Sequence, residues 1–467
     1  MMPGGGASPH DATVDVLVIG AGGCGLVAAL AANDLGAEVA VVEKQDRPMG
    51  NTVLSSGSIP GAGTRFQRAA GIVDSPETYV ADLAAVTGPH EAMHLTERLA
   101  AQSAPLVEWL VDRVGIELTL IDTYKHVGHS VHRLHAPPDR RGETLMAGLL
   151  KAADVRGIPV AFGNPARELL VDGGRVVGAV TETAHGDTAR IGAAAVVLAV
   201  NGFAAAPDLL AAHCPVAAGA PYAGAPGSQG EALRWGAALG AGFGNLGAYQ
   251  AHASFADPHG TLVTWTVVEK GGIVVDAAGR RFGDETLGYS AFADEELARS
   301  GPFFVIYDDR IADLVGAGQP DFAELGAMGG FAGGDSPEAL AAKIGADPDL
   351  LADTLAEVAL AADGTLACPF GRSAWGGGLS HGHLRATRVA PAVLHTQGGL
   401  MVDREARVLT AAGEPIPGLY AGGGAAVGIS GLAGSRGYAS GNGLLGALGL
   451  GQIAGTAAVR DRLSAAA

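Results

Sequence analysis

The sequence predicts an α/β fold in which a discontinuous, Rossmann-like nucleotide-binding domain is interrupted by an inserted α+β domain. Three observations support this prediction. The chain has 467 residues, which is long for a single core. It opens with a strand, a glycine loop, a helix and a strand, and similar segments return only near the C-terminus. Glycine and alanine are abundant and aromatic residues are few, which suits tight βα turns and close helix packing.

The N-terminal segment reads as a βαβ unit. Residues 15–19 (DVLVI) form an apolar, β-branched run that predicts a buried strand. Glycines follow, and an alanine-rich stretch to about Leu35 predicts a helix. Residues 37–43 predict the second strand, and this order is typical of a dinucleotide-binding domain.

The following elements continue this domain. Residues 75–114 have helical periodicity, with Pro76 near a plausible N-terminus. Strands are predicted at 158–161, 168–171, 176–181 and 195–199, and the turn at 172–174 (DGG) suits a hairpin.

The character of the chain changes after about Gly244. Strand-like segments at 260–268 and 272–276 precede a helical tract near 340–361. The nucleotide-binding pattern returns from His395, with strands at 399–402 and 418–421 and a last helix from about Asn442. We therefore expect a flexible tail (1–12), a first part of the nucleotide-binding domain (13–244), an inserted capping domain (245–369) and a second part of the nucleotide-binding domain (370–467).

Charge and composition exclude several functions. The net charge of -18 disfavours nucleic acid as a partner, because no block of Lys and Arg offsets it. The three cysteines lie far apart without a C-x-x-C pair, which argues against an iron–sulfur cluster, a c-type haem and a disulfide framework. Neither a signal peptide nor a membrane span is evident, so we expect a cytoplasmic location.

The first glycine loop, G-x-G-x-x-G, predicts nucleotide binding. Gly20 would make the tight turn, Gly22 would let the backbone approach a pyrophosphate, and Gly25 would allow helix and strand to pack closely. Glu43 ends the second strand, where a carboxylate can bind ribose hydroxyls. The loop alone is compatible with NAD, with FAD or with a purely structural turn.

Motifs along nearly the whole chain narrow this choice. The chain resembles the flavoprotein family of fumarate reductase and succinate dehydrogenase, including the 3-ketosteroid 1-dehydrogenases. The resemblance rests on DVLVIGAGGCGLVAAL, VVEK, NTVLSSGSI, VVLAVNGF, GRRFGDE, HTQGGLMVD, GLYAGGGA and SGNGLL. It implies a GR2-type FAD-binding domain whose inserted cap closes over the flavin.

The resemblance also implies a set of FAD contacts. They are Gly20, Gly22, Gly23, Gly25, Glu43 and Lys44 at the first loop; Asn51, Thr52, Ser55, Ser56 and Gly57 along the flavin; Ala166 and Gly202 near the adenine; Gly423 and Gly424; and Asn442, Leu444 and Leu445 at a helix start facing the flavin N1–C2 edge. Asn51 stands where covalent members have His, so we expect non-covalent FAD. Gly424 stands where the family often has Glu, which affects one ribityl contact.

The resemblance implies chemistry at a CH–CH bond beside a carbonyl. The fumarate reductases have an acid Arg eight residues after the Arg of their G-x-R-F-x-N-E motif, and here the residue eight after Arg281 is Tyr289. This Tyr resembles the base of the ketosteroid dehydrogenases, and Tyr438 resembles the second Tyr, which polarises the ketone. We therefore expect a desaturase in which Tyr289 takes the proton and flavin N5 takes the hydride.

Other residues indicate an ene-acid reductase instead. His252 in Q-A-H and His395 in H-T-x-G-G resemble histidines that bind a substrate carboxylate in the fumarate reductases. Arg436 resembles their last carboxylate-binding Arg, although it lies six residues before Asn442 rather than four. In this alternative, of the fumarate or urocanate type, Tyr289 would donate the proton.

A third alternative is a non-catalytic flavin-binding subunit. In every case we expect a small-molecule substrate with a carbonyl or carboxylate and a separate electron donor or acceptor.

A metal site is suggested by four histidines that recur every third residue, His126, His129, His132 and His135, but Gly128 and two prolines break any regular helix. A strand would put them on alternate faces, so we expect no metal site.

Overall fold

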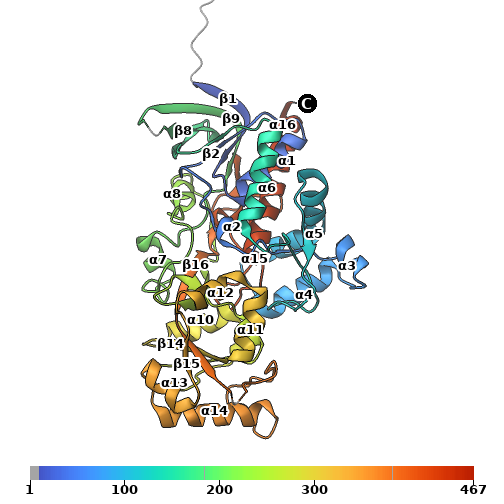
Figure 1. Cartoon of the computed structure of the whole chain (residues 1–467). Helices are drawn as coiled ribbons and strands as arrows, with labels where there is room; N and C mark the ends of the chain where they lie inside the picture. Colours follow the sequence, from blue (N-terminus) through green and yellow to red (C-terminus); the bar gives the residue numbers. More distant parts are fainter. Residues whose placement is uncertain (1–9, 184, 381, 467) are drawn as a thin grey trace, which may run out of the picture.

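The computed structural model describes residues 10–183, 185–380 and 382–466 (Figure 1). Two sheets organise the chain. The upper part in Figure 1 holds the N-terminal strands together with the C-terminal helix, and the lower part holds α10 (Tyr289–Leu297) to α14 (Pro348–Ala362). Segments from both ends of the sequence therefore build one body, and the middle of the sequence builds the other.

The first sheet has eight strands, and its central pairs are parallel. Its order is β18 (Arg407–Leu409), β19 (Pro415–Ala421), β9 (Thr188–Leu198), β1 (Ala12–Ile19), β2 (Val39–Val42) and β6 (Val160–Ala161), with the hairpin β7 (Ala166–Asp172) and β8 (Arg175–Glu182) beside β9. Ile19 pairs with Val42 on one side and Leu198 on the other, so the carboxyl ends of these strands meet at one edge. Such an edge is where open α/β sheets bind ligands.

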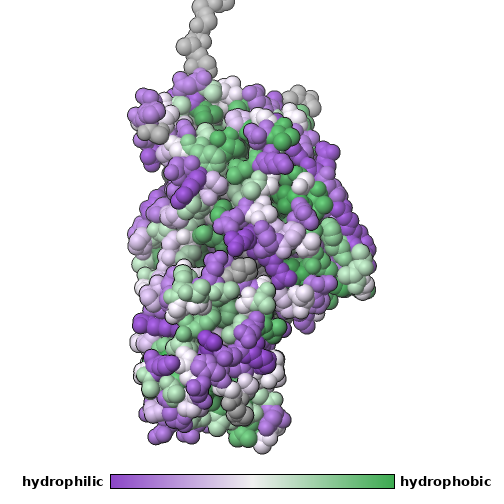
Figure 2. Space-filling model, in the orientation of Figure 1, coloured by the Kyte–Doolittle hydropathy of each residue, from purple (hydrophilic) through white to green (hydrophobic). Residues whose placement is uncertain are grey.

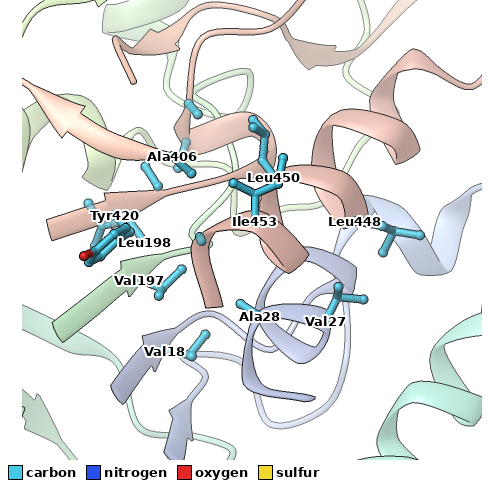
Figure 3. Packing of buried hydrophobic residues seen from close by; sticks show 14 of the residues in the cluster. Val18, Val27, Ala28, Val197, Leu198, Ala406, Tyr420, Leu448, Leu450 and Ile453 are labelled. Carbon is cyan, nitrogen blue, oxygen red and sulfur yellow. The ribbon is translucent and has the colours of Figure 1, made fainter. Parts of the chain in front are cut away.

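Apolar side chains between this sheet and its helices form the largest core. Helices α1 (Gly23–Asp34), α6 (Gly142–Val155) and α16 (Leu450–Ala466) cover it. Figure 3 shows Val18 and Val197 of the strands below Leu450 and Ile453 of α16. Alanines and glycines allow the close approach of α1 to α16, because an added Cβ at Gly455 would lie 2.1 Å from the carbonyl oxygen of Ala28.

The second sheet is built mainly by the inserted segment. Its order is β12 (Thr261–Leu262), β11 (Gly247–Ala256), β16 (Leu384–Thr396), β14 (Phe303–Asp308) and β13 (Ile273–Val275), with β15 (Ala332–Gly334) beside β16 and β20 (Ala433–Gly434) beside β11. The same segment also forms the helices α10, α11 (Asp309–Gly318), α12 (Pro320–Ala327), α13 (Pro337–Ile344) and α14. Figure 2 shows that this part, the cap, is narrower than the upper part and that hydrophilic and hydrophobic residues alternate over the face shown.

The structure differs from the sequence expectations at four places. Residues 75–114 form α4 (Pro76–Thr87) and α5 (Met93–Trp109) followed by a π-helical turn, because Gly88 breaks the helix with a φ of 61°. Residues 266–269 form the helix α9 (Thr266–Glu269) rather than a strand. Ala12, assigned to the tail, is the first residue of β1, and residues 1–9 of that tail lie outside the described residues. β16 pairs with β11 and β14, so the expected boundary at 369/370 precedes a central strand of the cap sheet.

The last helix begins where the sequence predicts it. A short segment α15 (Asn442–Leu444) continues through a π-helical turn (Leu445–Gly449) into α16. Among the described residues, no helix combines the length and the apolarity needed to cross a membrane.

Candidate active site

One cavity of about 1350 Å³ runs from the first glycine loop into the cap. It is lined by the carboxyl ends of β1, β2 and β9, by the start of the C-terminal helix, and by β11, α10, α11 and β16 of the cap. Small-molecule pockets usually hold about 300–1,000 Å³, so this cavity can hold a dinucleotide and a further small molecule.

The glycine loop has the geometry that the sequence predicts. Gly20 has a φ of 107°, and an added Cβ would lie 2.4 Å from the carbonyl oxygen of Ala199. A Cβ at Gly25 would lie 1.8 Å from the carbonyl oxygen of Gly20, so α1 packs directly on the loop. A Cβ at Gly22 would meet nothing within 4 Å, and this residue lines the cavity. The loop and the N-terminus of α1 therefore leave room for a pyrophosphate.

Two acidic residues flank this end of the cavity. Glu43 accepts hydrogen bonds from the backbone N–H of Ala21 at 2.8 Å and of Gln45 at 2.9 Å. Lys44 forms an ion pair with Glu231, whose other carboxylate oxygen is buried without a hydrogen-bond partner in the described residues. Sequence reasoning missed Glu231, although an acid directly after Gly230 at the start of α8 (Glu231–Ala238) is a possible signal.

Most of the expected FAD contacts line this cavity. The lining ones are Gly20, Gly22, Gly23, Glu43, Lys44, Asn51, Thr52, Ser55, Ser56, Ala166, Gly423, Gly424 and Leu444. Asn51 is additionally fixed, because its side-chain oxygen accepts a hydrogen bond from the N–H of Ala225 at 2.7 Å.

Five further expected contacts are not among the residues that line the cavity: Gly25, Gly57, Gly202, Asn442 and Leu445. Each of them packs against neighbouring parts of the fold. Gly25 touches the loop itself, and an added Cβ at Gly57 or Gly202 would lie 3.0 Å from Pro137 or 2.2 Å from Thr396. Asn442 accepts a hydrogen bond from Tyr79 at 3.4 Å, and Leu445 belongs to the large core. They support the wall by packing.

At the cap end, Tyr289 and His252 meet as a stacked pair. Their ring centroids are 4.6 Å apart with an interplanar angle of 16°. The Tyr289 hydroxyl lies 3.4 Å from Oγ of Ser440, a residue that sequence reasoning did not single out. Nδ1 of His252 accepts a hydrogen bond from the N–H of Ser254 at 3.2 Å, which leaves the ring proton on Nε2.

Tyr438 and His395 form the neighbouring pair. Their ring centroids are 5.7 Å apart, and the rings of Tyr438 and Tyr289 are 6.4 Å apart. The Tyr438 hydroxyl accepts a hydrogen bond from the N–H of Gly443, in the first turn of the C-terminal helix, at 3.2 Å. Its own proton is therefore available to another acceptor in the cavity.

Burial keeps this group of four residues uncharged. It lowers the pKa of His252 to about 3, and it lowers the pKa of His395 to about 4 although a backbone hydrogen bond to Thr396 opposes it. Burial raises the pKa of Tyr289 to about 12, opposed by the Ser440 hydrogen bond and reinforced by Glu269. It raises the pKa of Tyr438 as well. Near neutral pH the imidazoles carry no positive charge and the phenols keep their protons.

Arg436 does not belong to this group, contrary to expectation. Its guanidinium pairs with Glu295, its side chain is 57% exposed, and it does not line the cavity. Tyr438 itself lies four residues before Asn442, the spacing at which the resemblance implies an Arg. Both positions at which an Arg is expected near the reacting group, 289 and 438, therefore carry Tyr.

A buried ion-pair network holds the loop that carries Tyr438. Arg133 pairs with Asp74 at 2.7 Å and with Asp82 at 2.8 Å, and its side chain is fully buried. It also donates a hydrogen bond to Nδ1 of His129 at 3.0 Å, and Nε2 of His129 in turn donates to the carbonyl oxygen of Ser440 at 2.8 Å. These contacts hold Ser440, and with it the loop beside Tyr289, Tyr438, His252 and His395.

Three of the four histidines of residues 126–135 form hydrogen bonds with different residues, and His126 packs on the ring of Tyr124. His129 bonds Ser440, His132 bonds the carbonyl oxygen of Tyr124 at 3.1 Å, and Nε2 of His135 bonds Thr64 at 3.0 Å. In the part of the chain that the structure describes, no group of three or more His, Cys, Asp or Glu side chains could hold a metal ion.

Comparison with known proteins identifies the family. The FAD binding domain family matches residues 15–443. The chain belongs to this family. This flavoprotein is 31% identical over 436 residues to a fumarate reductase (cytochrome) of Shewanella frigidimarina, covering 91% of this chain and 74% of that protein. It is 30% identical over 433 residues to the NADH:fumarate oxidoreductase of Klebsiella pneumoniae (strain 342), covering 91% of this chain and 46% of that protein, so it spans about half of that relative's length.

A solved structure confirms the architecture. The 3-ketosteroid Δ1-dehydrogenase from Sterolibacterium denitrificans, in complex with 1,4-androstadiene-3,17-dione, superposes with a TM-score of 0.78 and 22% identity over 96% of this chain and 100% of that one. This likeness shows the fold. The resemblance to the fumarate reductase/succinate dehydrogenase flavoproteins and the α/β fold are thus confirmed, and this flavoprotein is an FAD-dependent oxidoreductase. The comparisons do not indicate a covalent bond to FAD.

Proposed function

We propose that this flavoprotein reduces a C=C bond conjugated with a carbonyl, in a substrate whose reacting end is uncharged. The observation that carries this proposal is the group of Tyr289, Tyr438, His252 and His395 on one wall of the cavity, with no guanidinium among them. Bound FAD supplies the hydride. A separate electron donor and a cytoplasmic location remain part of the proposal.

Tyr289 is suited to donate the proton. A phenol with a pKa raised to about 12, mainly by burial, keeps its proton near neutral pH. The carbon beside a carbonyl becomes strongly basic as hydride arrives at its neighbour, so the phenol can protonate it. His252 stacks on the Tyr289 ring and limits its orientation.

Tyr438 is suited to hold the carbonyl oxygen. Its hydroxyl accepts the N–H of Gly443, which orients the oxygen and leaves the O–H to donate. Negative charge that develops on the carbonyl oxygen is stabilised by this donor, which is already oriented toward the cavity. The same donor binds a ketone, an aldehyde or an ester.

Desaturation, the direction that the sequence favours, would require Tyr289 to lose its proton first. Burial opposes this, Glu269 and Tyr124 oppose it further, and only the Ser440 hydroxyl stabilises the phenolate. The contacts of Tyr289 therefore favour its role as a donor over its role as a base.

Reduction of a fumarate-like dicarboxylate has weaker support. Two carboxylates need positive charge at the reacting end, and His252 and His395 are neutral because burial lowers the pKa of each. Arg436 is paired with Glu295 outside the cavity. A non-catalytic flavin subunit would have no need of two tyrosines directed at the same cavity.

A direct test uses the reduced holoprotein. Dithionite-reduced protein is mixed anaerobically with 2-cyclohexenone, with cinnamaldehyde or with fumarate, and return of the flavin absorbance is followed. We expect rapid reoxidation by the uncharged compounds and little by fumarate. Reoxidation by fumarate alone would support the ene-acid reductase. Bleaching of the oxidised flavin by saturated ketones, without reoxidation by the enones, would establish the desaturase.

A further inference from the structure

Arg140 differs from Lys44 and Arg141, two other cations that line the cavity. Lys44 pairs with Glu231, and Arg141 faces Glu143 at 3.6 Å and Asp321 at 3.9 Å. Among the described residues, no carboxylate pairs with Arg140. Its guanidinium donates a hydrogen bond from Nη2 to Oγ1 of Thr123 at 3.3 Å and another to the Tyr124 side chain. Most of its donors are thus unused, although the side chain is half-buried at the cavity wall.

The surroundings of Arg140 hold its guanidinium in place. The guanidinium carbon lies 5.5 Å from the ring centroid of Tyr124, and this ring also packs on His126 at 4.4 Å. The backbone N–H of Arg140 donates to the carbonyl oxygen of Pro137 at 2.8 Å. Arg140 has a φ of 54°, a conformation that side chains rarely adopt and that glycine would adopt without strain. An Arg at this position is consistent with a function for its side chain.

Arg140 and the proton donor share one neighbour. Tyr124 carries the guanidinium on its ring and is close enough to Tyr289 to act on it electrostatically. The cap wall of the same cavity offers apolar side chains among its polar ones: Phe255, Leu262, Trp265, Leu314, Val315 and Phe322. A ligand that reaches from Tyr289 to Arg140 would thus have an uncharged reacting end, an apolar body and an anionic far end.

We infer that Arg140 binds a carboxylate that the substrate carries at the end remote from its reacting carbonyl. This inference rests on the proposed function and names the substrate class: an apolar unsaturated carbonyl compound with a distal carboxylate. The planar guanidinium can bind both carboxylate oxygens, and stacking on Tyr124 presents its edge. Lys270, which also lines the cavity and has no ion pair among the described residues, adds positive charge. Glu269 lies beside Lys270; burial raises the pKa of this carboxyl, and Lys270 lowers it.

The test measures binding to the oxidised holoprotein, which does not require turnover. The probes are cyclohexenones joined to a carboxylate through a phenyl, benzyl or phenethyl spacer, each paired with its methyl ester. Perturbation of the flavin spectrum gives Kd. We expect the best-fitting acid to bind about tenfold more tightly than its ester, the size of one charge-assisted hydrogen-bonded pair at a half-exposed site.

Substitutions assign this preference to Arg140. Arg140→Asn removes the guanidinium with a residue that tolerates positive φ, and it should abolish the preference while leaving ester binding unchanged. Arg140→Lys should retain part of it, because the charge remains without the planar fork. Arg141→Gln is the matched control: it removes the same charge one residue away and should change the preference by less than about twofold.

Two results would overturn the inference: equal binding of acid and ester across all spacers, or an acid preference that survives Arg140→Asn. Failure of the proposed function looks different. In that case none of these enones reoxidises the reduced flavin, whereas the binding preference of the oxidised protein is still measurable.

Discussion

The two ends of the cavity are built by different means. At the nucleotide end, Gly20 and Gly22 line the cavity with main chain, and Gly25 lets α1 pack against the loop that carries them. At the cap end, Tyr289, Tyr438 and two imidazoles shape the wall with side chains. A wall of main chain depends on the spacing of a few glycines, so it is shared across a family. A wall of side chains changes its chemistry with single substitutions, as the tyrosines at 289 and 438 illustrate.

The effect that reaches both folding and FAD binding is expected at the main-chain wall, from Gly25→Ala. The added Cβ would lie 1.8 Å from the carbonyl oxygen of Gly20, so the loop and α1 must separate. Overpacking of this kind costs about 1–3 kcal/mol, which corresponds to FAD binding weakened by roughly tenfold to hundredfold. The ratio of flavin to protein absorbance after dialysis measures it.

Gly316→Ala in α11 serves as the control, because an added Cβ there meets nothing within 4 Å. It should keep full FAD content. If Gly25→Ala also kept full FAD content and the same thermal midpoint, main-chain packing would not be what defines the nucleotide end.

An effect confined to the chemical step, and larger in magnitude, is expected at the side-chain wall, from Tyr289→Phe. Loss of a positioned general acid lowers the rate by about a thousandfold, while FAD content and the spectrum of the oxidised flavin are retained. Stopped-flow reoxidation of the reduced holoprotein by an enone measures the rate. Tyr307→Phe removes a buried hydroxyl that contacts Thr387 in the cap core, and it should leave the rate within about twofold. A rate unchanged by Tyr289→Phe would remove this Tyr from the chemistry.

The third effect is on stability at low pH. The folded-state pKa values of His252 (about 3) and His395 (about 4) lie below the value of about 6.5 for an unfolded chain. Between pH 6.5 and about 4 the unfolded chain binds protons that the folded chain does not, so stability falls as pH falls. Each of the two histidines contributes about 1.4 kcal/mol per pH unit in this window.

The thermal midpoint of the holoprotein at pH 7.5, 6.0 and 4.8 tests this dependence. At pH 7.5, His252→Gln should change the thermal midpoint through packing alone. As the pH falls, the midpoint of this variant should decrease less steeply than that of the wild type. Parallel declines for the two proteins would contradict the neutral state of the buried imidazole.

Much of the nucleotide end could be predicted from the sequence, because its elements depend on local patterns. The run DVLVI, the glycine loop and the hairpin at 172–174 each specify a short-range geometry, and each appears as β1, the loop before α1 and the turn between β7 and β8. The cap was harder to predict, because its strands pair across long separations. β16 pairs with β11 and β14, from which it is separated by many residues of sequence, and no local sequence pattern predicts this pairing.

The candidate site was predictable by position but not by environment. Tyr289, Tyr438, His252 and His395 all line the cavity, as their motifs imply. Their protonation follows from burial, which only three-dimensional packing reveals. Arg436 has the residue type of a carboxylate ligand, yet a shift of two residues along the loop directs it to Glu295 on the outside.

The buried pair of Arg133 with Asp74 and Asp82 has a consequence for how this enzyme could diversify. Arg133 holds the loop that carries Ser440 and Tyr438 through its hydrogen bond to His129. Replacing Arg133 or one of its two aspartates would leave an uncompensated charge in the interior. Apolar cap residues such as Phe255 and Leu262 have no charge to leave unpaired. Replacing them with apolar side chains of similar volume should cost little stability. We therefore expect that substitutions which change the substrate range, in natural lineages or in laboratory libraries, occur among these cap residues, while Arg133, Asp74 and Asp82 are retained.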